Sequence, residues 1–304
     1  MIPPPSKAPR LFCFGLGYSA LVLARRLRAL GWAIAGTCRG GGERDALARE
    51  GIDAYLFDHD RSIAAALGGI THLVSSVPPD MAGDPVLARH GRAISASAPH
   101  LVWAGYLSTT GVYGDRAGGL VDETSPLRPT GERGHRRRAA EEAWLDLWRR
   151  HGVPVHLFRL AAIYGPGRSA LDQVKAGTAR RIDKPGQVFS RIHVDDIATV
   201  LAASMARPNP GAAYNLCDDE PAPPAQVVAF ACALLGVAPP PLVPFDRADL
   251  SPMARSFYDD NKRVDNARIK KELGVSLRYP DYATGLRALM TAEGATAEGE
   301  TPAA

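Results

Sequence analysis

A glycine-rich turn between an apolar run and a helical pattern most constrains how this chain of 304 residues folds. The run 11–14 leads into Gly15-x-Gly17-x-x-Ala20, and apolar residues at helical spacing follow over 21–30. Gly15 permits a tight turn, Gly17 lets the backbone approach a pyrophosphate, and Ala20 lets the helix pack on the strand. Phosphates would lie at the helix N-terminus, where free N–H groups attract anions. The pattern predicts a dinucleotide site; the alternative is an ordinary glycine-rich strand–helix turn.

Short apolar runs alternate with helical patterns along most of the chain. Runs of this kind are typical of strands buried on both faces, and their alternation with helices predicts an α/β fold with a parallel sheet. The expected strands are 10–14, 33–37, 54–57, 72–76, 100–105, 155–159 and 213–216, and the expected helices include 19–30, 85–98, 136–150 and 195–206.

The pattern loosens after about residue 160, where stretches rich in Gly, Arg and Pro indicate loops and short helices. We expect a dinucleotide-binding core over 10–163 and a smaller substrate lobe over 164–291. The last core strand, at about 213–217, and further core helices are interleaved with that lobe. Residues 1–9 and 292–304 are expected to form disordered tails.

The bulk composition excludes few functions. A net charge of +4 does not require a nucleic-acid partner, and we expect none. No apolar run reaches the length of a membrane span and the first residues lack a signal-peptide core, so we expect no membrane association. No group of side chains has metal-ligand spacing. The four cysteines form no Cys-x-x-Cys pair and indicate reduced thiols in a cytoplasmic protein.

The tip of the second expected strand indicates which dinucleotide is bound. Folds that bind NAD place an acidic residue there, on the ribose 2′-hydroxyl. This chain has Arg39 at that position and no carboxylate. An arginine suits the 2′-phosphate of NADP, so we expect NADP, with NAD and a solvated loop arginine as the alternatives. Asp58, after the third strand, is placed either to contact the adenine edge or to cap the next helix.

Four further segments occur in a recognisable order: 107–114 (LSTTGVYG), 158–168 (FRLAAIYGPGR), 191–197 (RIHVDDI) and 213–219 (AYNLCDD). With them the chain resembles the extended short-chain dehydrogenase/reductases, the NAD(P)-dependent epimerase/dehydratase-like family. The resemblance implies a Rossmann-type doubly wound parallel sheet of about seven strands with a smaller, interleaved substrate lobe. It also implies a small-molecule substrate, and it suggests a homodimer formed through two long helices.

The same resemblance extends the expected cofactor site beyond the glycine-rich turn. The residues that would hold the dinucleotide are Gly15, Gly17, Tyr18, Ser19, Ala20, Arg39, Asp58, Ser75, Ser76, Arg137 and Leu160.

The family's chemistry depends on a Ser or Thr and on a Tyr-x-x-x-Lys pair that shares one helix face. Here the tyrosine position holds Arg133 and the lysine position holds Arg137. Arginine stays protonated, so Arg133 cannot act as a general base, although it can stabilise an oxyanion and Arg137 can still bind a ribose. Thr109 matches the family's Ser/Thr position, with Ser108 and Thr110 as close rivals.

Three side chains could replace the missing acid/base. His135 titrates in the right range, but it lies about 200° around the helix from Arg133 and should point away. Tyr113 lies beside the expected threonine, and Tyr164 lies in the loop near the expected nicotinamide. His193 is expected to be a packed structural residue rather than a catalyst.

Tyr164, Arg168 and Arg191 are the candidate substrate-binding residues. The two arginines could bind an anionic substrate. Alternatively, they pair on the surface with nearby carboxylates such as Asp172 or Asp195.

Three functions follow from these observations. The first is an NADP-dependent oxidoreductase of the atypical extended short-chain type, which transfers hydride to or from a small carbonyl, alcohol or sugar-like compound. The second is a non-catalytic NADP(H)-binding redox sensor or regulator, suggested by the two arginines at the Tyr/Lys positions. The third is an epimerase or dehydratase of nucleotide sugars, which would also need a substitute for that pair.

Overall fold

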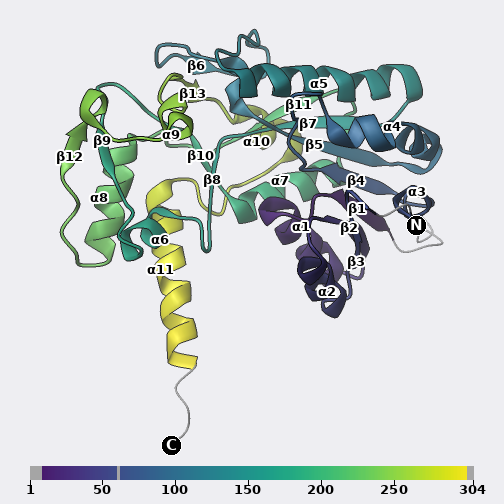
Figure 1. Ribbon diagram of the computed structural model, residues 1–304, viewed down its shortest axis with the longest axis horizontal. Helices are drawn as coiled ribbons and strands as arrows, with labels where there is room; N and C mark the ends of the chain where they lie inside the picture. The colour runs from purple at the N-terminus through teal and green to yellow at the C-terminus, as the bar shows by residue number, and fades with distance from the viewer. Residues whose placement is uncertain (1–8, 60–61, 300–304) are drawn as a thin grey trace, which may run out of the picture.

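The core of the molecule is one parallel sheet of seven strands. The computed structural model describes residues 9–59 and 62–299. The strands lie in the order β11-β7-β5-β4-β1-β2-β3 (Figure 1). Their bounds are β1 Arg10–Phe14, β2 Ala33–Cys38, β3 Asp53–Leu56, β4 His72–Ser75, β5 Trp103–Thr109, β7 Val155–Leu160 and β11 Ala213–Leu216. The predicted Rossmann-type sheet is therefore confirmed, and seven strands fall where seven were expected.

Helices cover both faces of this sheet, as parallel strands buried on both faces require (Figure 1). One face is covered by α1 (Tyr18–Ala29), α2 (Gly41–Arg49), α7 (Val194–Ala206) and α10 (Ala267–Leu273). The other face is covered by α3 (Ile63–Ala66), α4 (Pro85–Ser97) and α5 (Glu132–His151). The two faces have separate apolar clusters because successive side chains of each strand point to opposite sides.

Two predicted boundaries were wrong near the site. The strand expected over 100–105 is β5, which begins at Trp103 and ends at Thr109, because the short helix η1 (Ala98–His100) precedes it. The helix expected from residue 136 begins at Glu132, after Gly131. As a result, Thr109 lies on β5 and Arg133 lies on α5, rather than on loops.

The carboxyl ends of the central strands meet at one edge of the sheet. Phe14 pairs with Ser75, Ser75 pairs with Tyr106, and Thr109 pairs with Leu160. In open α/β sheets ligands bind outside this edge. The register therefore places the glycine-rich turn after β1 and the threonine segment after β5 along the same edge.

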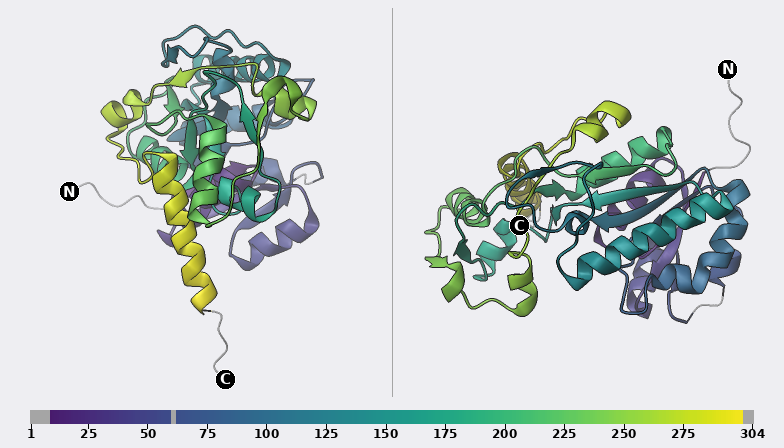
Figure 2. Two further views of the ribbon diagram at one scale, coloured as in Figure 1. Left: turned by 90° about the vertical axis from the view of Figure 1, so that its left-hand side faces the viewer. Right: turned by 90° about the horizontal axis from the view of Figure 1, so that it is seen from above.

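A smaller lobe lies beside this edge (Figure 2). It contains the parallel strand pairs β8–β10 and β9–β12 and, next to the core, β6–β13. Its helices α8 and α11 pack side by side, with α6 against both. The bounds are β6 Leu120–Val121, β8 Ala162–Tyr164, β9 Arg181–Asp183, β10 Arg191–His193, β12 Leu242–Pro244, β13 Arg263–Val264, α6 Ala170–Lys175, α8 Pro224–Leu234, α9 Pro252–Ser256 and α11 Tyr282–Gly299; the short helices η2 (Thr110–Tyr113) and η3 (Phe245–Arg247) complete the list.

The expected tails fall partly outside the described residues. This applies to residues 1–8 of the N-terminal segment and to residues 300–304 of the C-terminal segment. The described part of the expected C-terminal tail, residues 292–299, is instead helical and continues α11 as far as Gly299, since Ala and Glu favour helix. All four cysteines are buried and none forms a disulfide. Across the part of the chain that the structure describes, no helix is both long and apolar enough to cross a bilayer.

Candidate active site

The glycine-rich turn joins β1 to α1 in the geometry that a dinucleotide requires. Gly15 has a φ of 81°, and its N–H donates to the Thr37 hydroxyl over 2.8 Å. A Cβ at Gly15 would lie 2.8 Å from Ser76 Oγ, whereas a Cβ at Gly17 would meet no atom within 4 Å. Gly15 is thus held by its neighbours, and Gly17 borders open space. Ala20 is fully buried and lets α1 pack on the sheet.

Within the described residues, neither the N-cap nor the first turn of α1 provides a side chain that would neutralise the partial positive charge of this helix N-terminus. Its N-cap is Gly17, which offers no side-chain hydrogen bond, and the first turn contains no acidic residue. Tyr18 opens the helix and Ser19 is buried behind it. Unsatisfied N–H groups and the helix dipole both favour an anion here. The residues present therefore fit a pyrophosphate.

Two serines lie at the end of β4, the neighbour of β1, at the same edge: Ser75 ends the strand and Ser76 follows it. Ser76 Oγ donates to the carbonyl of Gly15 over 2.6 Å and so fixes the turn. Ser75 is fully buried, and its Oγ has no hydrogen-bond partner among the described residues. An unpaired buried hydroxyl is unfavourable, and Ser75 is the one of the two serines whose Oγ has no partner within the described part of the chain.

The tip of β2 carries the side chain expected to distinguish NADP from NAD. Arg39 is exposed, and its backbone N–H donates to the Glu43 carboxylate over 3.1 Å. Gly40 is the N-cap of α2 and provides no side-chain hydrogen bond. Asp58 instead forms an exposed ion pair with Arg89 of α4. The expectation that Asp58 caps the next helix was wrong, because Ser62 occupies the N-cap position of α3.

Thr109 ends β5, and its hydroxyl donates to no group among the residues that the structure describes. Its Oγ1 accepts from the N–H of Gly111 over 3.1 Å, which leaves the O–H free to donate. Ser108, by contrast, is buried and donates to the Glu141 carboxylate over 2.6 Å. Thr110 begins η2. Of the three neighbouring hydroxyls, Ser108 is removed as a candidate because its role is structural.

Arg133 and Arg137 lie one turn apart on α5. Arg137 Nη1 donates to the carbonyl of Leu107 over 2.6 Å, which fixes its guanidinium two residues before Thr109. Arg133 is exposed, and its guanidinium lies 5.3 Å from the ring centre of Phe257 in the lobe. A Cβ at Gly134 would lie 2.9 Å from the carbonyl oxygen of Gly111, so the helix start and the threonine segment touch.

Tyr113 is a structural residue, and the expectation that it could be catalytic is corrected. It is fully buried, its hydroxyl donates to Asn215 Oδ1 over 2.7 Å, and it accepts from Arg159 over 2.9 Å. Burial raises the pKa of Tyr113 to about 12, despite the nearby arginine. A hydroxyl satisfied on both sides, with so high a pKa, is a poor acid/base at neutral pH.

The remaining acid/base candidates also lie away from Thr109. His135 lines a hollow of 500 Å³ on the flank of α5, together with Arg138 and Glu142. Tyr164 is buried, its hydroxyl donates to the carbonyl of Asp281 over 3.4 Å, and burial raises its pKa. His193 is a packed residue as expected: its Nδ1 accepts from the N–H of Asp195 at the start of α7.

The two lobe arginines occupy different environments. Arg191 Nη1 donates to the carbonyls of Phe189 and Ala222, over 2.8 and 3.0 Å. Arg168 is exposed, and its guanidinium lies 5.7 Å from the ring centre of Tyr18 in the glycine-rich turn. Neither forms the expected ion pair with Asp172 or Asp195 in the described part of the chain. That expectation was wrong because Asp172 instead caps α6.

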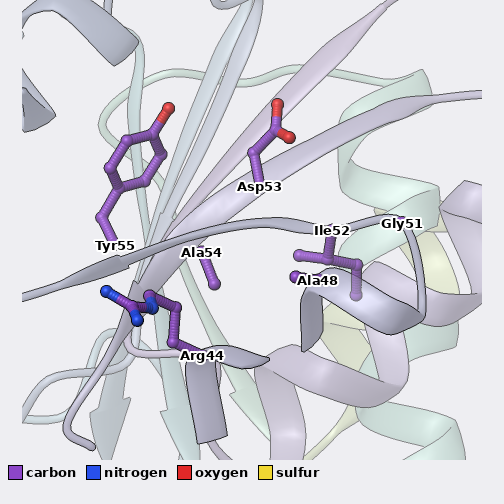
Figure 3. A pocket seen from close by; sticks show the side chains of 7 residues that line it. All are labelled: Arg44, Ala48, Gly51, Ile52, Asp53, Ala54 and Tyr55. Atoms are coloured by element: carbon purple, nitrogen blue, oxygen red, sulfur yellow. The ribbon is translucent and has the colours of Figure 1, made fainter. Parts of the chain in front are cut away.

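A second hollow, of 360 Å³, lies between α2 and the edge strand β3 (Figure 3). Arg44 of α2 and Ala54 of β3 lie on the side of the helix, whereas the Tyr55 ring points to the opposite side of the strand (Figure 3). Neither hollow includes Thr109 or a residue of the glycine-rich turn.

Comparison with known proteins decides the family. A sequence model of the NAD-dependent epimerase/dehydratase family matches residues 101–217. Protein YeeZ of Escherichia coli strain K12 is 30% identical over 286 residues, which cover 88% of this chain and 95% of YeeZ. The chain belongs to the NAD-dependent epimerase/dehydratase family.

Solved structures of similar proteins have the same overall fold. A functionally unknown conserved protein from Silicibacter pomeroyi DSS is 54% identical and superposes with a TM-score of 0.89, covering 94% of this chain and 99% of that one. A dTDP-glucose 4,6-dehydratase from Bacillus anthracis, solved in complex with NAD, is 15% identical with a TM-score of 0.76, covering 96% and 98% of the two chains. The latter likeness shows the shared fold.

Within this NAD-dependent epimerase/dehydratase family member, sequence reasoning missed the buried polar groups behind the site. Arg159 and Glu141 form a buried ion pair over 2.9 Å. Asp218, after β11, is 1% exposed and both of its carboxylate oxygens lack a hydrogen-bond partner among the described residues. Burial raises the pKa of Asp218 to about 8, although Arg191 opposes the shift. The available signal was a charged residue inside or directly after an apolar strand, since such a residue must be paired or neutral.

Proposed function

We propose that this family member is an NADP(H)-dependent oxidoreductase of the atypical extended short-chain type, acting on a small carbonyl, alcohol or sugar-like compound in the cytoplasm. One observation carries the proposal. The uncapped N-terminus of α1 and the free hydroxyl of Thr109 lie along the same edge of one sheet. Such an edge provides a place for the cofactor and a hydrogen-bond donor for the substrate oxygen.

In the proposed reaction, each side chain of the site has a distinct role. The bound nicotinamide supplies or accepts the hydride. Thr109 donates its hydroxyl proton in a hydrogen bond to the substrate oxygen, and the Arg133 guanidinium stabilises negative charge on that oxygen. Arg137, fixed against Leu107, presents a positive charge to the ribose side of the site. Because arginine does not release its proton, the proton that completes an alcohol comes from solvent through Thr109.

The proposed preference for NADP rests on Arg39 and the glycines that follow it. The Arg39 side chain has no hydrogen bond or ion pair with the residues that the structure describes, and it adjoins the uncapped start of α2. Both features favour a 2′-phosphate. Glu43 opposes the preference, because its carboxylate accepts the Arg39 N–H and occupies part of the same region.

Calorimetric titration with NADP(H) and NAD(H) tests the cofactor. Loss of one charge-assisted contact of about 1.5–3 kcal/mol predicts that Arg39→Ala weakens NADP(H) binding by roughly 10- to 100-fold and leaves NAD(H) binding unchanged. Arg49→Ala removes an exposed arginine from the far end of α2 and serves as the control. Equal loss for both dinucleotides would contradict the assigned role of Arg39.

Measurements of turnover then distinguish the proposed oxidoreductase from the two other candidate functions, a sensor and an epimerase or dehydratase. Consumption of NADPH with aldehydes, ketones or nucleotide sugars, lost in Thr109→Val, supports the oxidoreductase. The arginines at the Tyr/Lys positions favour a second candidate, a non-catalytic NADP(H) sensor. That candidate predicts tight binding without turnover and a protein partner whose affinity changes with the cofactor. Redox-neutral conversion of a nucleotide sugar would instead support an epimerase or dehydratase.

A further inference from the structure

The segment after β8 folds back onto the glycine-rich turn. Tyr18 Oη donates to the carbonyl of Pro166 over 3.0 Å, across 148 positions of sequence. A Cβ at Gly165 would lie 2.6 Å from that same hydroxyl. The first residue of α1 and the start of the lobe are thus in direct contact, and the contact requires a glycine.

The folded-back segment is a short, well-defined turn. Gly165 and Arg168 exchange two backbone hydrogen bonds, of 3.2 and 3.0 Å. Pro166 and Gly167, whose φ is 69°, occupy the two central positions, and each residue suits its position in a type II turn. Ser169 then caps α6 reciprocally with Asp172. The backbone of Arg168 is therefore held on both sides.

This turn directs a positive charge toward the cofactor side of the site. The Arg168 guanidinium lies 5.7 Å from the ring centre of Tyr18. In the described residues it has no carboxylate partner: Asp172 accepts from Ser169, and Asp195 lies 3.7 Å from His193. An exposed arginine with no ion pair among the described residues thus stands beside Tyr18, the first residue of α1.

We propose that Arg168 binds the pyrophosphate of the dinucleotide from the lobe side, with the Tyr18 ring as its platform. The inference rests on the proposed function and assigns Arg168 to the cofactor rather than to the substrate. The phosphates would be held between backbone N–H groups of α1 and a guanidinium from the turn 165–168. Arginine suits this position because its planar group stacks on an aromatic ring and still donates to phosphate oxygens.

The proposal is tested by comparing a ligand that contains the pyrophosphate with one that does not. Arg168→Ala is expected to weaken NADP(H) binding by roughly 10-fold or more in calorimetry and to leave the weak binding of 2′-AMP unchanged. Arg168→Lys should recover part of the affinity, since it keeps the charge without the fork. Arg247→Ala, which removes an exposed arginine elsewhere in the lobe, should behave like the wild type.

A second pair of variants distinguishes the contribution of the Tyr18 ring to binding from an effect on folding. Tyr18→Phe keeps the ring and removes only the hydrogen bond to Pro166, whereas Tyr18→Leu also removes the aromatic face. The expected order of NADP(H) affinity is wild type, then Phe, then Leu, with thermal unfolding showing that each variant is folded. NADP(H) binding that Arg168→Ala leaves at the wild-type level overturns this inference alone. A wild-type protein that binds neither NADP(H) nor NAD(H) overturns the proposed function, and this inference with it.

Discussion

The two halves of the sheet edge have the same backbone architecture but different chemistry. On the side of β1, β2 and β4 the site is made of glycines, serine hydroxyls and open helix termini. On the side of β5, β7 and β11 it is backed by charged side chains. They include the buried pair of Arg159 and Glu141 and Asp218, whose carboxylate has no hydrogen-bond partner among the described residues. The first half provides shape and N–H groups, and the second provides charge.

This difference separates binding from chemistry. Anion binding by backbone needs only a turn that glycine can form and a helix that starts there, so the pattern survives in a short motif. Chemistry at the other half depends on individual side chains, which can be exchanged without loss of the fold. Here Arg133 and Arg137 stand where the family's Tyr/Lys pair was expected, yet α5 packs against β5 and β7.

The largest expected effect lies in the charged half. Glu141→Gln should lower the free energy of unfolding by about 3–5 kcal/mol, because Arg159 would remain buried without a counter-charge. Urea unfolding measures the change. Glu142→Gln, which alters an exposed pair with Arg149 on the same helix, should cost less than about 1 kcal/mol.

A double variant sharpens this first test. Glu141→Gln combined with Arg159→Met removes both buried charges, so much of the lost stability should return. If the double variant is no more stable than Glu141→Gln alone, the ion pair is not the source of the effect, and the contrast between the halves weakens.

The second effect depends on pH. Burial raises the pKa of Asp218 to about 8, so the folded state keeps a proton that the unfolded chain, with a carboxyl pKa of about 3.9, releases. The stability that this group contributes is complete below about pH 4 and is lost as pH rises through 8. Allowing for relaxation and water access, we expect a loss of about 2–3 kcal/mol, measured by urea unfolding between pH 5 and 9.

Asp218→Asn should remove this pH dependence. The variant keeps the size of the side chain and cannot ionise, so its stability should change less than that of the wild type between about pH 5 and 9. Asp246→Asn, at an exposed position in η3, is the control and should retain the wild-type slope. An unchanged slope in Asp218→Asn would mean that the carboxyl is ionised in the folded protein and has found a partner.

The features that the sequence predicts are also mostly those built by the backbone, as in the first half of the sheet edge. The seven strands, the turn at Gly15 and Gly17, and the helix α7, whose first turn contains Asp195, all follow from local patterns of apolar and small residues. Such patterns act over neighbouring positions, where periodicity is informative. The positions of Arg133 and Arg137 on one helix were predicted as well, since they follow from a spacing of four.

The unpredicted features join residues far apart in sequence. Nothing near Tyr113 indicates that its hydroxyl bonds Asn215, 102 positions away. Likewise, nothing near Arg168 indicates that it lies over Tyr18 rather than beside Asp172. Such pairings are set by how the elements pack, because a polar atom inside the fold bonds whichever partner packing brings within reach.

The smallest expected effect tests the backbone half directly. Gly17→Ala places a Cβ in open space, at a backbone φ of −85° that alanine accepts, so the free energy of unfolding should change by less than about 1 kcal/mol. The same methyl group would occupy room needed for close approach of a pyrophosphate, so NADP(H) affinity should fall by about 10-fold, or ~1.4 kcal/mol, in calorimetry. Gly91→Ala, which also adds a methyl group into open space but within α4, should leave that affinity unchanged. If Gly17→Ala binds NADP(H) as the wild type does, the phosphates do not lie over this turn, and the contrast between a backbone-built and a side-chain-built half of the site fails.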